Sequence, residues 1–83
     1  MMRITIEISV FPLDKNYSPV IRSFIDSLQS RPGIEVILQP MSTLLVGDYD
    51  DCMHLIQHEL KKVFESDRTA ISIVKLANLD LTD

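Results

Sequence analysis

The chain has 83 residues, of which 46% are hydrophobic and 24% charged, and its formal net charge is −4. Leu, Ile, Val and Phe supply 29 of these residues, which excludes a disordered chain, and no apolar run approaches the ~20 residues of a membrane-spanning helix. Its densest basic cluster is only Lys61-Lys62, whereas nucleic-acid binding requires clustered cations, so that function is not expected. We expect one domain over residues 1–83.

The N-terminal half predicts a strand followed by a helix. Apolar and polar residues alternate over residues 4–10, the pattern of a strand with one apolar face, and Phe11-Pro12 ends it. A helix is predicted to begin at Ser18-Pro19, because Ser is a good N-cap and Pro a good first residue. An apolar stripe runs to Leu28, and Arg31-Pro32-Gly33 stops the helix.

The next segment predicts an antiparallel hairpin. Residues 34–39 are rich in β-branched side chains, and residues 43–46 form a second apolar strand that Gly47 closes. The connection, Pro40-Met41-Ser42, is too short for anything but a tight turn between antiparallel strands.

A second helix and a last strand complete the chain. The helix is predicted to follow residues 47–50, with Asp48 or Asp50 as its cap. The last strand runs from Thr69 to about Ala77, and residues 78–83 are expected to be a tail.

The predicted order, β-α-β-β-α-β, indicates an α+β fold of the ferredoxin-like type. In this fold two helices lie on one face of a four-stranded antiparallel sheet of order 4-1-3-2, and the other face stays open. The first and third strands are central, which places Glu7 near Ser42 and Thr43. Two helices cover only one face, so we expect the surplus of apolar residues to lie on the open face and the edges, as contact between subunits.

Glu7 is the most informative polar residue, because Glu is disfavoured in the middle of a central strand. One interpretation is an ion pair, for which Lys75 on the last strand is a suitable partner. The other is a carboxylate directed at a ligand and flanked by Ser9, Ser42 and Thr43. Hydroxyls with one carboxylate suit a polar heterocycle that bears an amino group.

Other reactive residues favour structural roles. Cys52 lies in the first turn of a helix, but Asp50 and Asp51 oppose a thiolate there, so a small apolar filler is expected. A lone cysteine and the absence of a signal-peptide core favour the cytoplasm. His54 and His58 share one helix face, yet Leu55 stands where the zinc-protease motif has Glu, so no metal is expected.

Two tyrosines precede the helices and are candidates for stacking on an aromatic ring. Tyr17 comes before the first helix cap and Tyr49 before the second helix. Either also suits a loop residue that covers the edge of the core, and for Tyr49 we favour that role.

Two segments resemble signatures of the small thiamine-binding, YkoF-like proteins. These are residues 7–13, EISVFPL, and residues 40–48, PMSTLLVGD. The resemblance extends from about Arg3 to Lys75. The chain departs from the family at Val46, where members often have an acidic residue, and after the last strand, where many have a basic run.

The resemblance implies a ferredoxin-like subunit that assembles through its sheet into dimers or tetramers. It also implies binding of thiamine or its hydroxymethylpyrimidine part without chemistry. The implied ligand contacts are Glu7, Ser9, Ser42 and Thr43, with Tyr17 as a further candidate. An acidic protein also suits a thiazolium cation.

These observations lead to a hypothesis and two alternatives. The hypothesis is a cytoplasmic, homo-oligomeric, non-catalytic protein that binds thiamine or a related pyrimidine for storage, delivery or sensing. The first alternative is an oligomeric interaction module with no small ligand of its own, in which Glu7 forms an ion pair at the sheet contact. The second is an enzyme acting on a pyrimidine, against which stands the lack of an activated nucleophile or acid–base pair.

Overall fold

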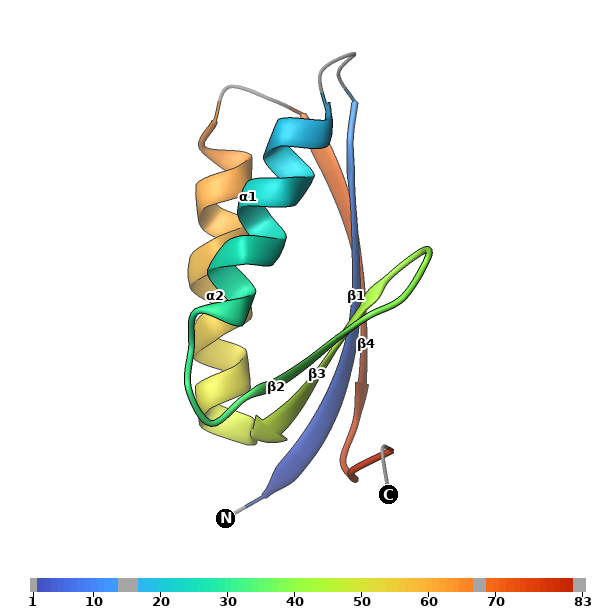
Figure 1. Cartoon of the computed structure of the whole chain (residues 1–83), viewed down its shortest axis with the longest axis vertical. Coiled ribbons are helices and arrows are strands. Elements are labelled where there is room, and N and C mark those ends of the chain that lie inside the picture. Colours follow the sequence, from blue (N-terminus) through green and yellow to red (C-terminus); the bar gives the residue numbers. More distant parts are fainter. Residues whose placement is uncertain (1, 14–16, 67–68, 82–83) are drawn as a thin grey trace.

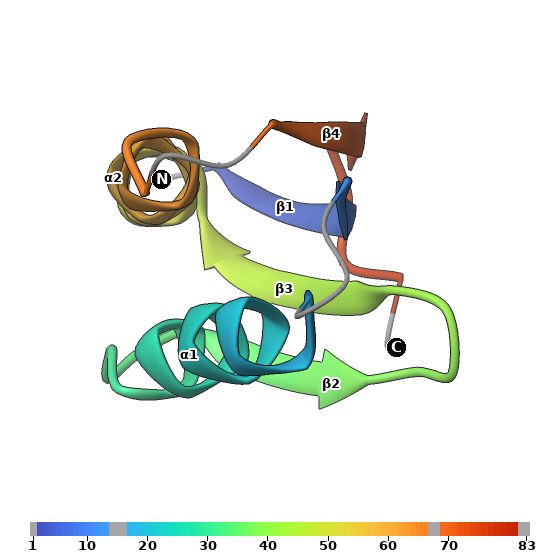
Figure 2. The ribbon, with the colours of Figure 1, turned by 90° about the horizontal axis from the view of Figure 1, so that it is seen from above.

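The computed structural model describes residues 2–13, 17–66 and 69–81. The strands form one antiparallel sheet in the order β2-β3-β1-β4, and Figures 1 and 2 show both helices on the same face of it. The predicted ferredoxin-like βαββαβ fold is confirmed. We call the two sides of the sheet the helix-side face and the open face. The elements are β1 (Arg3–Pro12), α1 (Tyr17–Gln29), β2 (Glu35–Leu38), β3 (Thr43–Asp48), α2 (Tyr49–Phe64) and β4 (Ala70–Ala77).

The core lies between the helices and the central strands. Ile4, Ile6 and Ile8 alternate along β1 onto the helix-side face, as the period-two pattern predicts, and all three are buried. Leu28 of α1 and Leu55 of α2 meet them in the same cluster. Full burial of side chains of this size stabilises the fold by about 1.5–3 kcal/mol each.

The start of α1 differs from the predicted one, whereas the stop after α1 and the cap of α2 agree with the sequence-based predictions. α1 begins at Tyr17, one residue before the predicted cap Ser18. Gly33 ends the turn after α1 with φ +84°, a conformation that glycine adopts without a steric penalty. The predicted end of the helix at residues 31–33 is thus confirmed. Asp48 is the N-cap of α2 and accepts a hydrogen bond from the Asp51 backbone N–H at 3.4 Å.

Gly47 does not close β3, contrary to the sequence-based expectation. The strand continues through it to Asp48, and Gly47 pairs with Ile4. A Cβ atom here would lie 3.2 Å from both the Cys52 Sγ and the Gly33 carbonyl oxygen. The glycine therefore permits close approach of the strand to α2 and to the turn after α1.

The helices cover the sheet unevenly. α1 packs on β1 and β2, whereas α2 packs on β3 and β1. Val74 and Leu76 of β4, on the helix-side face by their pairing with Ile8 and Ile6, consequently remain exposed. The apolar surplus therefore occurs on both faces of the edge strand β4, in agreement with the expectation that it lies on the open face and the edges.

Candidate functional site

The open face carries a polar cluster centred on Glu7. Glu7 lies in the middle of β1, between Leu44 of β3 and Lys75 of β4 in the strand register. Its Oε1 is 3.6 Å from the Lys75 Nζ, so the ion pair of the first interpretation forms. Its Oε2 accepts a hydrogen bond from the Ser42 hydroxyl at 3.1 Å. The predicted proximity of Glu7 and Ser42 is thus confirmed.

Ser42 links Glu7 to the loop between β2 and β3. Its Oγ is also 2.8 Å from the side-chain oxygen of Gln39. A hydroxyl has one proton, so it cannot donate to both oxygens at once. If the Gln39 amide is turned by 180°, its NH2 group donates to the Ser42 oxygen. The Ser42 hydroxyl can then donate its proton to Glu7, so that both contacts are hydrogen bonds. The arrangement is a relay of hydrogen bonds from Gln39 through Ser42 to the carboxylate.

Ser9 fastens the same loop to β1. Its hydroxyl donates to the Met41 carbonyl oxygen at 3.0 Å. Ser9 is two residues from Glu7 on one strand, so both side chains belong to the open face. This hydrogen bond positions the loop that carries Ser42 and Gln39 beside Glu7.

Thr43 does not join this cluster. It pairs with Ile8, whose side chain is in the core, and is itself buried on the helix-side face. Successive residues of a strand point to opposite faces, so Thr43 cannot share the face of Glu7. The predicted group of Glu7, Ser9, Ser42 and Thr43 is therefore divided between the two faces of the sheet. The side chain of Tyr17 lies outside the described residues.

A cavity of about 630 Å³ is lined by residues of β1, α1 and the loop between β2 and β3. Ligand pockets in proteins typically measure about 300–1,000 Å³. Apolar side chains from β1, α1 and the segment from β2 into the following loop make most of its wall, and none of the described lining residues is charged. They are Ile8, Ser9, Val10, Phe11, Pro12, Ile21, Phe24, Ile25, Leu38, Gln39, Pro40, Met41, Ser42 and Thr43.

Predicted ligand contacts that belong to opposite faces of the sheet meet at the cavity. Ser9, Ser42 and Thr43, three of the predicted contacts, all line it, and Glu7 lies one hydrogen bond away through Ser42. Gln39 lines it too and was missed by the sequence reasoning, although its place three residues before Ser42 in a tight turn is a usable indication. The arrangement suits a flat heterocycle with apolar faces and a few polar edge groups.

The remaining reactive residues lie elsewhere. Cys52 is fully buried in the core, as expected of an apolar filler, and burial, with Asp51 and Asp48 nearby, raises the pKa of its thiol. His58 is exposed, with its Nε2 4.0 Å from Glu59 Oε2. Within the described ranges there is no group of three or more His, Cys, Asp or Glu residues able to hold a metal ion. Tyr49 is the exposed first residue of α2, not a loop residue before it.

Glu59 is a buried carboxylate that the sequence pattern did not single out. It lies on α2 beside a smaller cavity of about 250 Å³ between the helices. Lys62, one turn further on, has its Nζ 3.0 Å from Glu59 Oε1. The exposed lysine thus gives the buried Glu59 carboxylate an oppositely charged partner.

Residues 6–77 match the family described as thiamine-binding protein. The chain belongs to this family. The matched range includes all of the cavity lining and both residues of the Glu7–Lys75 ion pair. No curated protein matches the sequence.

Solved structures support the same fold. Protein SP2199 from Streptococcus pneumoniae is 25% identical, with a TM-score of 0.85 over 98% of this chain and 91% of that one. Hypothetical protein MJ1052 from Methanocaldococcus jannascii is 21% identical, with a TM-score of 0.81 over 100% and 87%. A putative thiamine biosynthesis/salvage protein, TM0486 from Thermotoga maritima, is 18% identical, with a TM-score of 0.69 over 88% and 82%.

None of the helices in the described ranges is long and apolar enough to cross a membrane.

Proposed function

We propose that this thiamine-binding family member binds thiamine or its hydroxymethylpyrimidine part, without catalysing a reaction, and acts as a homo-oligomer. The observation that carries the proposal is the cavity of about 630 Å³ lined by β1, α1 and the loop between β2 and β3. Its apolar and aromatic walls suit the faces of a pyrimidine ring, and Ser42, Thr43 and Gln39 offer polar partners for the ring edge.

Glu7 supplies the charge that the cavity wall lacks. A carboxylate accepts hydrogen bonds from the amino group of an aminopyrimidine or from its protonated ring nitrogen. Glu7 is connected to the cavity through Ser42, and its ion pair with Lys75 holds it in place. A ligand amino group that replaces the Ser42 proton would thus meet a carboxylate that is already oriented.

The non-catalytic part of the proposal is supported by the state of the Cys52 thiol and by the chemistry of the cavity wall. The Cys52 thiol is buried in the core, and its raised pKa keeps it protonated near neutral pH. The described cavity wall contains hydroxyls and an amide but no acid–base pair. These groups can bind and orient a ring, whereas a reaction on it needs proton transfer or a nucleophile.

The Glu7–Lys75 ion pair also favours a second candidate, an interaction module with no small ligand. Both side chains lie on the open face, beside the exposed Ile73, where a subunit contact is expected. In that case the ion pair organises the contact between copies, and the cavity has no ligand.

Calorimetric titration separates the candidates. The folded protein is titrated with thiamine, its phosphates and hydroxymethylpyrimidine, and the binding protein is expected to take up at least one of them. Absence of binding at millimolar ligand by a folded oligomer would rule out the thiamine proposal.

Glu7→Gln identifies the role of the carboxylate. It keeps the shape but removes the charge, so loss of a charge-assisted hydrogen bond should raise the Kd about 10- to 100-fold. Glu65→Gln, at the exposed C-cap of α2, is the matched control and should bind like the wild type. Lost binding in an intact oligomer supports the binding protein, whereas lost assembly with no ligand bound supports the interaction module.

A further inference from the structure

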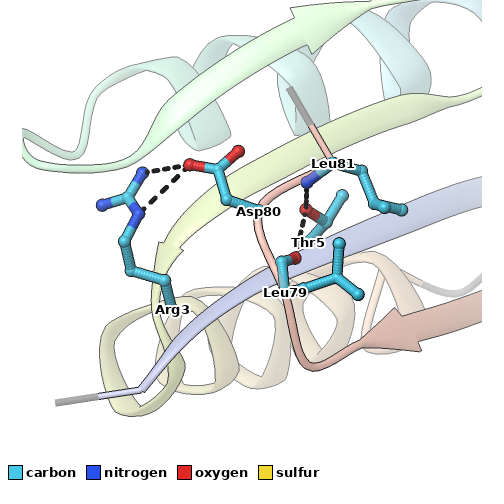
Figure 3. Close-up of polar contacts among 5 residues, drawn as sticks. All are labelled: Arg3, Thr5, Leu79, Asp80 and Leu81. Atoms are coloured by element: carbon cyan, nitrogen blue, oxygen red, sulfur yellow. Dashed lines mark hydrogen bonds and ion pairs between the residues drawn. The ribbon is translucent and has the colours of Figure 1, made fainter. Parts of the chain in front are cut away.

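Residues 78–81, which we call the C-terminal strap, are anchored to the start of β1 (Figure 3). The Thr5 hydroxyl donates to the Leu79 carbonyl oxygen and accepts from the Leu81 N–H, both at 2.9 Å. The Arg3 guanidinium contacts Asp80 Oδ2 through Nε at 3.2 Å and Nη2 at 3.1 Å. A segment expected to be a tail is thus held by both backbone and side-chain contacts.

The strap lies on the open face. Figures 1 and 2 show the chain leaving β4 and turning back across the face that has no helices. Thr5 and Val46 pair with each other on this face, yet they are only 3% and 0% exposed. Their burial on an otherwise uncovered face indicates that the strap covers this end of the sheet.

While the strap covers one end of the open face, it also exposes two apolar side chains of its own. Leu79 is 51% exposed and Leu81 is 60% exposed, although the backbone between them is fixed by the Thr5 hydroxyl. Fixing a segment costs conformational entropy, and leucines held in water add no stability to the single chain. Exposed apolar side chains on an ordered segment are typical of an interaction surface.

The open face has the pattern of a surface that meets a copy of itself. On this face of β1 and β4, Glu7 pairs with Lys75, Phe11 with Ile71 and Ser9 with Ile73, so one pair is oppositely charged and another is apolar on both strands. A two-fold axis that runs along the sheet between these strands places each β1 residue over the β4 residue of the other copy. Glu7 then meets the other copy's lysine, Phe11 meets an isoleucine of the other copy, and the two straps meet at one end.

We propose that the C-terminal strap is part of the interface with a second copy of this chain, with Leu79 and Leu81 as its contact residues and Thr5 and Arg3 as its anchors. This inference rests on the self-association in the proposed function and adds the surface that produces it. Because the anchors order the leucines before the copies meet, association loses less entropy than it would with a free tail.

Sedimentation velocity over a concentration series tests the proposal. Leu79→Ser/Leu81→Ser should raise the dissociation constant of self-association at least about 100-fold, because two buried leucines are lost from each copy. Thr5→Val keeps the shape of the anchor but removes both hydrogen bonds, and should raise the constant about tenfold while leaving both leucines in place. Circular dichroism checks that both variants are folded.

Phe64→Ser and Thr69→Val are the matched controls. Both residues are exposed, Phe64 on α2 and Thr69 just before β4, and their variants should associate like the wild type. Wild-type association in the folded double serine variant would overturn the strap as an interface while leaving the proposed homo-oligomer intact. A wild-type chain that is monomeric at every concentration would overturn both.

Discussion

Adjacent residues of this chain can have separate environments, and Ser42 and Thr43 show why. Ser42 contacts Glu7 at the edge of the open face, whereas Thr43 is buried against the core. The sequence reasoning grouped them because they follow each other just before a central strand. The exact residue at which the turn becomes a strand decides which hydroxyl points to which face, and that boundary is the least certain part of a sequence-based prediction.

Cys52 gives a pH-dependent prediction at the same scale. Burial raises the pKa of its thiol in the folded chain, with Asp51 and Asp48 acting in the same direction. Above the pKa of an unfolded cysteine, about 8.5, the unfolded chain has lost a proton that the folded chain keeps. The free energy of unfolding should therefore fall as pH rises above about 8, by at most about 1.4 kcal/mol per pH unit from this group.

Cys52→Ala isolates that contribution. Urea unfolding of both proteins between pH 7 and 10 should show the wild-type advantage shrinking as pH rises, because alanine cannot ionise. Other groups titrate equally in both proteins and cancel in the difference. A difference that stays constant over this range would contradict the prediction.

At the scale of elements, the sequence predicted every helix and strand, and the errors lie at their ends. Alternation in β1 and the apolar stripes of the helices are strong signals, because the residues that form these patterns are the ones that pack in the core. Gly47 was misread as a strand end because glycine often marks a turn. Its actual role, to avoid a Cβ contact with Cys52 and Gly33, depends on packing between segments distant in sequence.

The N-terminus of α2 provides a prediction for one element. The Asp48 side chain accepts from the Asp51 N–H, and its charge is favourable at the positive end of the helix. Asp48→Ala should lower the free energy of unfolding by about 1 kcal/mol, measured by urea denaturation. Asp48→Asn keeps an acceptor and should lose less. Equal losses for the two variants would mean that the cap contributes through its charge and not through this hydrogen bond.

At the scale of the whole molecule, the apolar surplus of a small chain is concentrated on β4. This edge strand exposes Ile71 and Ile73 on the open face and Val74 and Leu76 on the helix-side face. An exposed apolar edge strand tends to associate. Composition predicted such a surplus, but its division between two faces depends on how the helices lie over the sheet, which the pattern of each helix does not specify.

Ile73 and Leu76 allow the two faces of β4 to be compared directly. They are 53% and 54% exposed on the same strand but belong to opposite faces. If copies associate through the open face, Ile73→Glu should convert the oligomer to monomer, because burying a carboxylate at the contact carries a large desolvation cost. Leu76→Glu should leave assembly unchanged. Both substitutions replace a half-exposed side chain, so neither should unfold the chain, and light scattering coupled to gel filtration reads the mass. Dissociation by Leu76→Glu alone would place the contact on the helix-side face instead.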